Sequence, residues 1–346
     1  MMMSVQSPES LPPPPQRPMG HSPLRRPHSM RRTASIDMTW PQGRRGQLHL
    51  IGRARDIYTP RAGGEPVVLA EDGMRAGTTR RAIDWIETDT TRADVSVLVG
   101  EQAGGFLRTT LEARLPQERD AGTPLYLLLD DLAGATLIAG WVWTQWTDDR
   151  KDPEQHAHRA ALRQRLEGVC TGFRPGSSAL LAPDGTYRLA NASRVIPLPH
   201  PDDPDGWHPL IHVDGIAMRR ARRIDVWLDD LIRIDSMFQD SATTPDGGRM
   251  AVHEYHLTAV ADPKTMTLVA VKADPRTLPY AECPSAVNNI QPLIGTPLVE
   301  LRTRVSRLLR KTAGCTHLND ALRALAEVPR LVASLPDPHH FAGDLA

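Results

Sequence analysis

The alternation of apolar and polar residues predicts that the first half of the chain consists largely of β-strands. Residues 47–56 and 82–88 alternate with a period of two, as half-buried strands do. Residues 95–99, 125–129 and 136–143 form short apolar runs, which we interpret as further, more deeply buried strands. Glycine-rich stretches between these runs supply turns.

The second half repeats part of this pattern. Residues 222–227 contain an Ile-Asp pair and a tryptophan, as residues 32–40 do. Residues 231–240 repeat the alternating strand of residues 48–56, and each strand ends in an aspartate. We interpret the similarity as an internal duplication of a small β unit. Chance similarity of short amphipathic strands explains it nearly as well, and the sequence leaves both explanations open.

The periodicity changes toward the C-terminus, where a hairpin and three helices are predicted. Residues 255–260 and 267–271 are strands joined by an Asp-Pro-Lys turn. The first helix covers residues 284–294, and the second follows Thr296, which can cap it. The third helix begins at Thr316 and has an apolar face at helical spacing.

These patterns indicate an α+β protein with a β-rich body, whose two similar halves are explained by duplication or by chance, and a C-terminal β-hairpin plus three-helix region. Few residues near the N-terminus can be buried, because a run of four prolines and several arginines dominates it. The predicted organisation is a disordered Pro/Arg-rich tail (1–30), a β-rich first half (31–150), a helical insert with loop and linker (151–210), the second β unit with hairpin and helices (211–335), and a disordered tail (336–346).

Composition and charge exclude several functional classes. The 346-residue chain is long enough for two domains. Its 41 basic and 41 acidic residues cancel, so we expect no nucleic-acid partner held by net charge. No apolar run long enough to span a membrane and no secretory pattern is expected, so the predicted location is the cytoplasm. Three cysteines without an export signal suit a reducing compartment.

Two cysteines stand where helices are predicted to begin. Cys283 immediately precedes the first C-terminal helix, and Cys315 immediately precedes the third. Unpaired backbone N–H groups at a helix start favour a thiolate and should lower the thiol pKa. With His317 nearby, the two thiols form a ligand set suited to zinc or an iron–sulfur cluster. His253 and Cys170 are weaker candidates for further ligands.

Other interpretations of the same residues remain open. Cys315 is also a candidate catalytic nucleophile, with His317 or His256 as the base. The thiols could equally be small buried side chains beside helix caps. A third interpretation is a non-catalytic module that binds a small molecule or a protein. The sequence does not identify the substrate, the metal or the oligomeric state.

The sequence resembles one uncharacterised family over most of residues 31–330. The resemblance is carried by an Ile-Asp pair at 36–37, a strand end at 52–56, the Cys-Pro at 283–284 and Gly-Cys-Thr-His-Leu at 314–318. In these features the chain resembles a bacterial family, domain-of-unknown-function family 2889. The resemblance implies no activity, because that family has none assigned.

A second resemblance covers residues 251–328. The order of a hairpin, Cys283, a Gly-Thr-Pro helix start and Cys315 is similar to that of the U-type iron–sulfur cluster scaffolds. Those proteins use three cysteines and an aspartate around such a hairpin and helices. The resemblance implies that Cys283 and Cys315 are two of the cluster ligands. The first scaffold cysteine has no match here, so the site would hold a different metal or take Cys170 or His253 as its third ligand.

Overall fold

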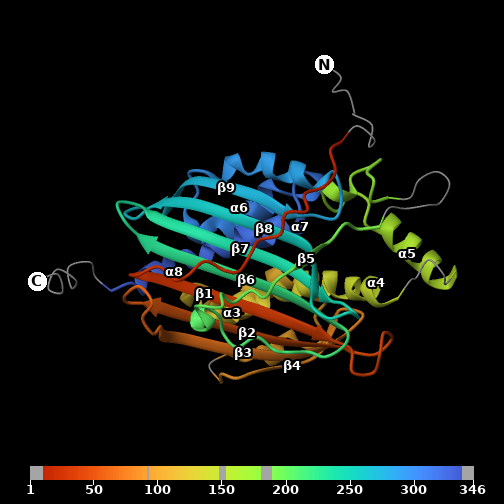
Figure 1. The fold of residues 1–346 in the computed structure, drawn as a ribbon, viewed down its shortest axis with the longest axis horizontal. Coiled ribbons are helices and arrows are strands. Elements are labelled where there is room, and N and C mark those ends of the chain that lie inside the picture. The colour runs from red at the N-terminus through yellow and green to blue at the C-terminus, as the bar shows by residue number, and fades with distance from the viewer. Residues whose placement is uncertain (1–10, 92, 148–152, 181–188, 337–346) are drawn as a thin grey trace, which may run out of the picture.

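The body of the protein is one nine-stranded antiparallel sheet (Figure 1). The computed structural model describes residues 11–91, 93–147, 153–180 and 189–336. Along the sheet the strand order is β4-β3-β2-β1-β6-β7-β8-β5, and β9 also pairs with β8. The strands are β1 (Ser29–Thr39), β2 (Leu48–Thr59), β3 (Val67–Thr79), β4 (Ala82–Thr88), β5 (Ser193–Val195), β6 (Ala217–Leu228), β7 (Ile232–Thr243), β8 (Arg249–Asp262) and β9 (Thr267–Thr277).

Two four-stranded units, β1–β4 and β6–β9, meet at the centre of this sheet. Strands β1 and β6 both carry Met-Arg-Arg, then three further residues and Ile-Asp, and they pair antiparallel along their whole length. Arg31 therefore meets Asp225 at 2.6 Å, and reciprocally Arg219 meets Asp37 at 2.7 Å. This reciprocal arrangement agrees with a duplicated β unit and joins both halves in one continuous sheet.

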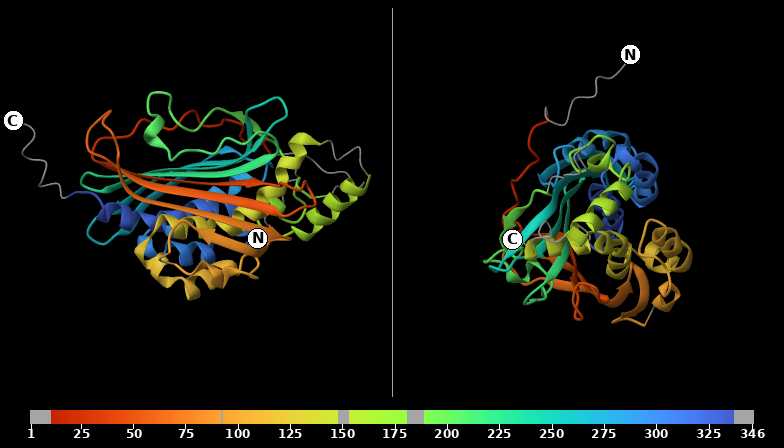
Figure 2. Two further views of the ribbon diagram at one scale, coloured as in Figure 1. Left: turned by 90° about the horizontal axis from the view of Figure 1, so that it is seen from below. Right: turned by 90° about the vertical axis from the view of Figure 1, so that its right-hand side faces the viewer.

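Most of the helices lie on one face of the sheet, as the edge-on view shows, and α5 lies beyond its end (Figure 2). Helix α3 (Pro124–Ile138) lies across β1, β2 and β3, and α7 (Thr316–Arg323) lies on β7 and β8. The other helices are α1 (Leu107–Arg114), α2 (Pro116–Ala121), α4 (Trp143–Trp146), α5 (Pro153–Arg165), α6 (Leu301–Leu308) and α8 (Val328–Ala333). The core lies between the sheet and this helical layer.

The prediction of strands at 125–129 and 136–143 is wrong, because these residues lie in α3 and the turns that follow it. The Thr123 hydroxyl accepts the Tyr126 N–H and caps the helix. Nearly every α3 residue is buried, so the segment lacks the polar face that would reveal a helical period. By length and composition Pro124–Trp146 could cross a membrane, but 78% of its apolar window is buried inside the fold.

Among the other predicted elements, several strands and one helix are confirmed, and two predicted elements are 3₁₀ turns instead. The alternating segments at 47–56 and 82–88 are β2 and β4, and the predicted C-terminal hairpin is β8–β9. Helix α7 begins at Thr316 as predicted. The predicted strand at 95–99 is instead a 3₁₀ turn, and the predicted helix at 284–294 consists of two 3₁₀ turns, η7 (Cys283–Asn289) and η8 (Gln291–Leu293).

Residues 11–28 do not form part of a free tail, which corrects the prediction for 1–30. They run along the face of the sheet opposite the helices, beside residues 193–212 (Figure 2). The Trp207 indole donates to Ser22 Oγ at 2.8 Å, and Arg25 pairs with Asp203 at 2.7 Å. The composition of this segment did not indicate that it is ordered, because hydrogen bonds and ion pairs, and not fully buried apolar side chains, attach it to the fold. Residues 1–10 and 337–346 lie outside the described residues.

Candidate functional site

A cavity of about 580 Å³ opens between the sheet and its helical cover. Its walls come from the end of α3, from α4 and α5, from β8 and from the start of α7. All three cysteines of the chain line it, together with two histidines. The structure thus brings together the five side chains singled out from the sequence: Cys170, Cys283, Cys315, His253 and His317.

Behind the wall of this cavity that carries His253 and His317, a carboxylate converges with the two imidazoles. Asp240 on β7 lies opposite His253 on β8 in the strand register, and His317 projects from the first turn of α7. Asp240 Oδ2 lies 3.6 Å from His253 Nδ1 and 3.5 Å from His317 Nε2. The two rings stack with centroids 3.4 Å apart and an interplanar angle of 16°. The ligand atoms of Asp240, His253 and His317 all lie within 4.8 Å of one another, so the three side chains could hold a metal ion.

The two facing ring nitrogens are buried without a hydrogen-bond partner. His253 Nδ1 and His317 Nε2 are both inaccessible to solvent, and neither makes a hydrogen bond within the described part of the chain. Leaving a buried polar atom unpaired costs about 1–3 kcal/mol. Two such atoms aimed at one carboxylate oxygen therefore mark a place where the fold tolerates a cost that a bound cation would offset.

The protonation states of this group suit metal binding. Burial lowers the pKa of His253, and burial together with the neighbouring His253 lowers the pKa of His317 well below its usual value. Burial alone would raise the pKa of Asp240, but the Arg220 guanidinium, together with His253 and His317, holds that pKa below its usual range. At neutral pH the site therefore offers two neutral imidazoles and one carboxylate.

Outer contacts fix the orientation of the carboxylate and of one imidazole. Arg220 donates to both Asp240 oxygens, at 2.9 and 3.1 Å, and to Asp320 of α7 at 2.8 Å. Thr316 Oγ1 lies 3.2 Å from His317 Nδ1, which leaves Nε2 directed at Asp240. Such second contacts hold ligating side chains in place in metal sites.

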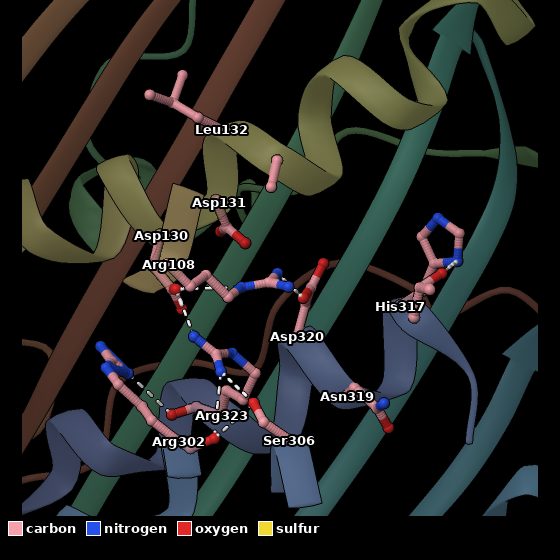
Figure 3. Close-up of polar contacts among 12 residues, drawn as sticks. Arg108, Asp130, Asp131, Leu132, Arg302, Ser306, His317, Asn319, Asp320 and Arg323 are labelled. Atoms are coloured by element: carbon pink, nitrogen blue, oxygen red, sulfur yellow. Dashed lines mark hydrogen bonds and ion pairs between the residues drawn. The ribbon is translucent and has the colours of Figure 1, made fainter. Parts of the chain in front are cut away.

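Buried ion pairs attach α7 to α3 and so fix the position of His317 (Figure 3). Arg108 bridges Asp130 of α3, at 3.3 Å, and Asp320 of α7. Arg323 of α7 donates to Asp130 at 2.5 Å and to Ser306 at 2.8 Å. Because two helices are joined by several charge-assisted hydrogen bonds, the first turn of α7 is held firmly against the sheet.

The thiol of Cys315 lies beside the same imidazole. Its sulfur is 4.0 Å from His317 Nδ1, on the side of the ring away from Asp240. Burial raises the pKa of the Cys315 thiol, although the Tyr255 hydroxyl and the N–H groups of the first turn of α7 act in the opposite direction. The expected lowering of this pKa is therefore wrong, because burial outweighs the helix terminus.

The other two thiols lie together on a neighbouring wall. A methyl group added at Gly172 would lie 2.7 Å from Cys283 Sγ and 3.8 Å from Cys170 Sγ, so both sulfurs pack against this glycine. Burial raises the pKa of Cys283 well above its usual value and that of Cys170 to about 12. Cys283 begins a 3₁₀ turn and not an α-helix, so it lacks the aligned N–H groups expected there.

Sequence reasoning found the histidines but missed their carboxylate partner. Among the described residues, the group of three that converges within 4.8 Å is Asp240, His253 and His317, and it contains no cysteine. The signal for Asp240 was present, since it is the acid that ends the second alternating strand. A thiolate ligand set of Cys283, Cys315 and His317 stays a prediction.

The first β unit, β1–β4, has a similar framework in which no histidine faces the carboxylate in the strand register. Asp56 stands where Asp240 stands, and Arg32 donates to both its oxygens at 2.6 and 2.5 Å. In the strand register, however, Asp56 faces Ala70, whereas Asp240 faces His253. The first half therefore keeps the buried ion pair but has no second ligand at this position.

Comparison with known proteins gives one family match, over part of the chain, and no activity. Residues 218–330 match the model of a family described as "Protein of unknown function (DUF2889)". This range contains Asp240, His253 and His317, together with Cys283 and Cys315, and it is narrower than the 31–330 expected from the sequence. No curated protein and no solved structure matches the chain. These comparisons give no support to a likeness with iron–sulfur scaffolds.

Proposed function

Since the family matched by residues 218–330 has no assigned function, we propose one from the site: this protein binds a divalent metal ion at Asp240, His253 and His317. The observation that carries the proposal is the spacing of the ligand atoms, 3.5 and 3.6 Å, without hydrogen bonds between them. Ligands about 2.0–2.1 Å from a tetrahedral zinc ion are separated by about 3.4 Å. The arrangement fits such an ion closely.

The donor set indicates which metals are suitable. Two imidazoles and one carboxylate bind zinc in sites that keep a position open, and the same set binds iron(II) in non-haem oxygenases. Both rings also line the cavity. We infer that an ion held here acts on, or orients, a small molecule in that cavity. The neutral rings and ionised carboxylate need lose no proton when the ion binds.

Replacing His253 with glutamine should abolish stoichiometric metal binding. The wild-type protein is expected to bind one equivalent of zinc or iron(II) in anaerobic calorimetric titration. Loss of a direct ligand should weaken affinity by more than the roughly 10–100-fold that loss of an outer contact costs. The His317→Gln variant should behave in the same way.

The matched control is His256→Gln. His256 lies on the same strand and contacts a carboxylate, Asp235, at 2.6 Å, but it has no second histidine beside it. Its replacement should leave metal affinity unchanged. Equal metal binding by wild type and the His253 variant would refute the proposal.

A second candidate function is covalent catalysis by Cys315. One specific observation favours it: the His317 ring lies between the thiol and the carboxylate. Its Nδ1 is 4.0 Å from Cys315 Sγ, and its Nε2 is 3.5 Å from Asp240 Oδ2. His317 Nδ1 would take the thiol proton, and Asp240 would stabilise the resulting imidazolium at Nε2. This requires the opposite tautomer from metal binding through Nε2, so the two functions of His317 are alternatives.

If Cys315 is the nucleophile, alkylation by iodoacetamide should depend on His317. A positioned base contributes about 100-fold or more, so His317→Gln should slow modification of Cys315 by that factor near neutral pH. Peptide mapping against pH would report each cysteine separately, with Cys283 as the internal reference. A Cys315 rate unaffected by the substitution excludes this candidate.

A further inference from the structure

We infer that the cavity binds an uncharged small molecule with a flat aromatic body. The inference deepens the proposed function by naming the class of molecule, and it rests on that function only for the role of the metal ion. Binding of the molecule itself rests on the aromatic rings, the uncovered aliphatic side chains and the uncharged state of the histidines and thiols that line the cavity.

Aromatic side chains form a large part of the lining. Among the described residues that line the cavity are Trp40, Trp141, Trp143, Phe173 and Tyr280, so three of the seven tryptophans of the chain lie here. Trp40 and Trp143 meet edge to face, with ring centroids 5.5 Å apart and an interplanar angle of 65°. Phe173 and Tyr280 do the same at 5.6 Å and 71°. A flat ring system can make further contacts of this kind with these rings, and such contacts contribute beyond the apolar area that they bury.

Aliphatic side chains extend this surface and remain in contact with solvent. Leu137, Leu162 and Val169 line the cavity and are 36%, 49% and 41% exposed. They come from α3, from α5 and from the segment that follows α5, so three parts of the chain bring apolar surface to one cavity. Removing such surface from water is favourable, and a molecule with an apolar body would cover it.

The charged side chains of the lining are engaged within the protein. The described lining contains three arginines, Arg44, Arg45 and Arg163, and no aspartate or glutamate. Each of these arginines interacts with another part of the chain. The Arg44 guanidinium lies over the Trp143 ring at 5.6 Å, and that of Arg163 lies over the Tyr280 ring at 5.7 Å. These cations support the aromatic rings, and the inference assigns them no contact with the bound molecule.

The histidines and thiols of the lining are uncharged at neutral pH. Burial lowers the pKa of His253 and that of His317. Burial raises the pKa values of the three thiols, those of Cys170, Cys283 and Cys315. Moving a carboxylate or an ammonium group from water onto such a surface costs free energy that an uncharged molecule does not lose.

The size of the cavity suits such a molecule. About 580 Å³ falls within the range of about 300–1,000 Å³ typical of small-molecule sites. The two histidines belong to the same lining as the aromatic rings. A bound ring system would therefore lie beside the wall that carries His253 and His317.

The test compares naphthalene probes that share one skeleton and differ in charge. Chelator-treated protein is titrated in a calorimeter with 2-naphthamide, with 2-naphthoate and with 2-naphthylmethylamine. We expect the uncharged amide to bind at least about tenfold more tightly than either ion, because only the ions lose the hydration of a full charge. The saturated analogue decahydronaphthalene-2-carboxamide should bind about fivefold more weakly than 2-naphthamide, because it makes no ring–ring contacts.

Two valines test whether the probe binds in this cavity. Val169→Asp places a charge on the lining at a residue that is 41% exposed, so the fold should tolerate it. It should weaken binding of 2-naphthamide by at least about tenfold, and Leu162→Asp is a second variant of the same kind. Val299→Asp is the matched control, because Val299 is 65% exposed and lies outside the lining. Its affinity for the amide should equal that of the wild type.

A zinc titration of the same protein separates this inference from the metal site. Selective binding of the amide, with no zinc bound at the histidines, would overturn the metal site and leave this inference standing. One bound equivalent of zinc without binding of any probe would do the reverse. Equal affinities for the amide and either ion, tighter binding of an ion, equal binding of the saturated analogue, or equal effects of Val169→Asp and Val299→Asp would also overturn the inference.

Discussion

Zinc affinity should fall by more than about 100-fold when Asp240 is replaced with asparagine, because a direct ligand is lost and outer contacts alone are worth about 10–100-fold. The variant should also be less stable. Removing one partner of a buried ion pair costs about 3–5 kcal/mol of unfolding free energy. Arg220 still has the Asp320 carboxylate at 2.8 Å in the variant, so this loss should lie toward the lower end of that range. Calorimetric zinc titration and urea unfolding measure the two effects.

The first β unit offers a matched control for this substitution. Asp56→Asn removes the equivalent carboxylate from Arg32, which keeps Glu327 at 2.6 Å. We expect a similar loss of stability and no change in zinc affinity, because Asp56 faces Ala70 and not a histidine. If both variants lost zinc binding equally, the effect would reflect stability and not ligation.

Acidification should act through the same carboxylate. The pKa of Asp240 is lower in the folded protein than its unfolded value of about 3.9. Its ionised form therefore contributes stability above that value, and this contribution is lost as the pH falls through the folded-state pKa. The asparagine variant should lack this part of the acid sensitivity.

The second large effect is expected from Arg220→Met, which should lower the free energy of unfolding by about 3–5 kcal/mol. The Arg220 side chain is fully buried and contacts three carboxylates, with separations of 2.9 Å to Asp240, 2.8 Å to Asp320 and 3.4 Å to Asp131. Its removal leaves Asp240 without its main counter-charge, so burial should raise the pKa of that carboxyl. Metal affinity should fall with it.

Arg233→Gln is the control for a cation on a neighbouring strand. Arg233 pairs with Asp229 at 3.0 Å, but the two side chains are 40% and 49% exposed. An exposed pair of this kind contributes at most about 1 kcal/mol. Equilibrium unfolding in urea compares the two variants, and equal small losses would show that the buried arginine does not organise this part of the sheet.

Strands and helices with a polar face could be predicted from the sequence, and fully buried ones could not. Residues 47–56 and 82–88 alternate because one side of each strand faces polar surroundings, and they form β2 and β4. Helix α3 is surrounded by protein on nearly all sides, so its sequence has no period that distinguishes a helix from buried strands. The segment 11–28 was missed for the opposite reason, since polar contacts fix it.

The site could be predicted in part, because its residues stand at places with a local signature. Cys315 and His317 flank the start of a helix, which the helical spacing of the apolar residues after Thr316 reveals. Asp240 lies on a strand, and its contact with His253 depends on the pairing of β7 with β8, which no local pattern fixes. The direction of the thiol pKa shifts could not be predicted either, because burial decides it and burial is a property of the whole fold.

The most direct test of the proposed metal site is the zinc-edge anomalous signal from crystals of the zinc-loaded protein. The account predicts one peak about 2.0–2.2 Å from His253 Nδ1, His317 Nε2 and an Asp240 oxygen. A peak about 2.3 Å from the sulfurs of Cys283 and Cys315, or no peak near the two histidines, would contradict it.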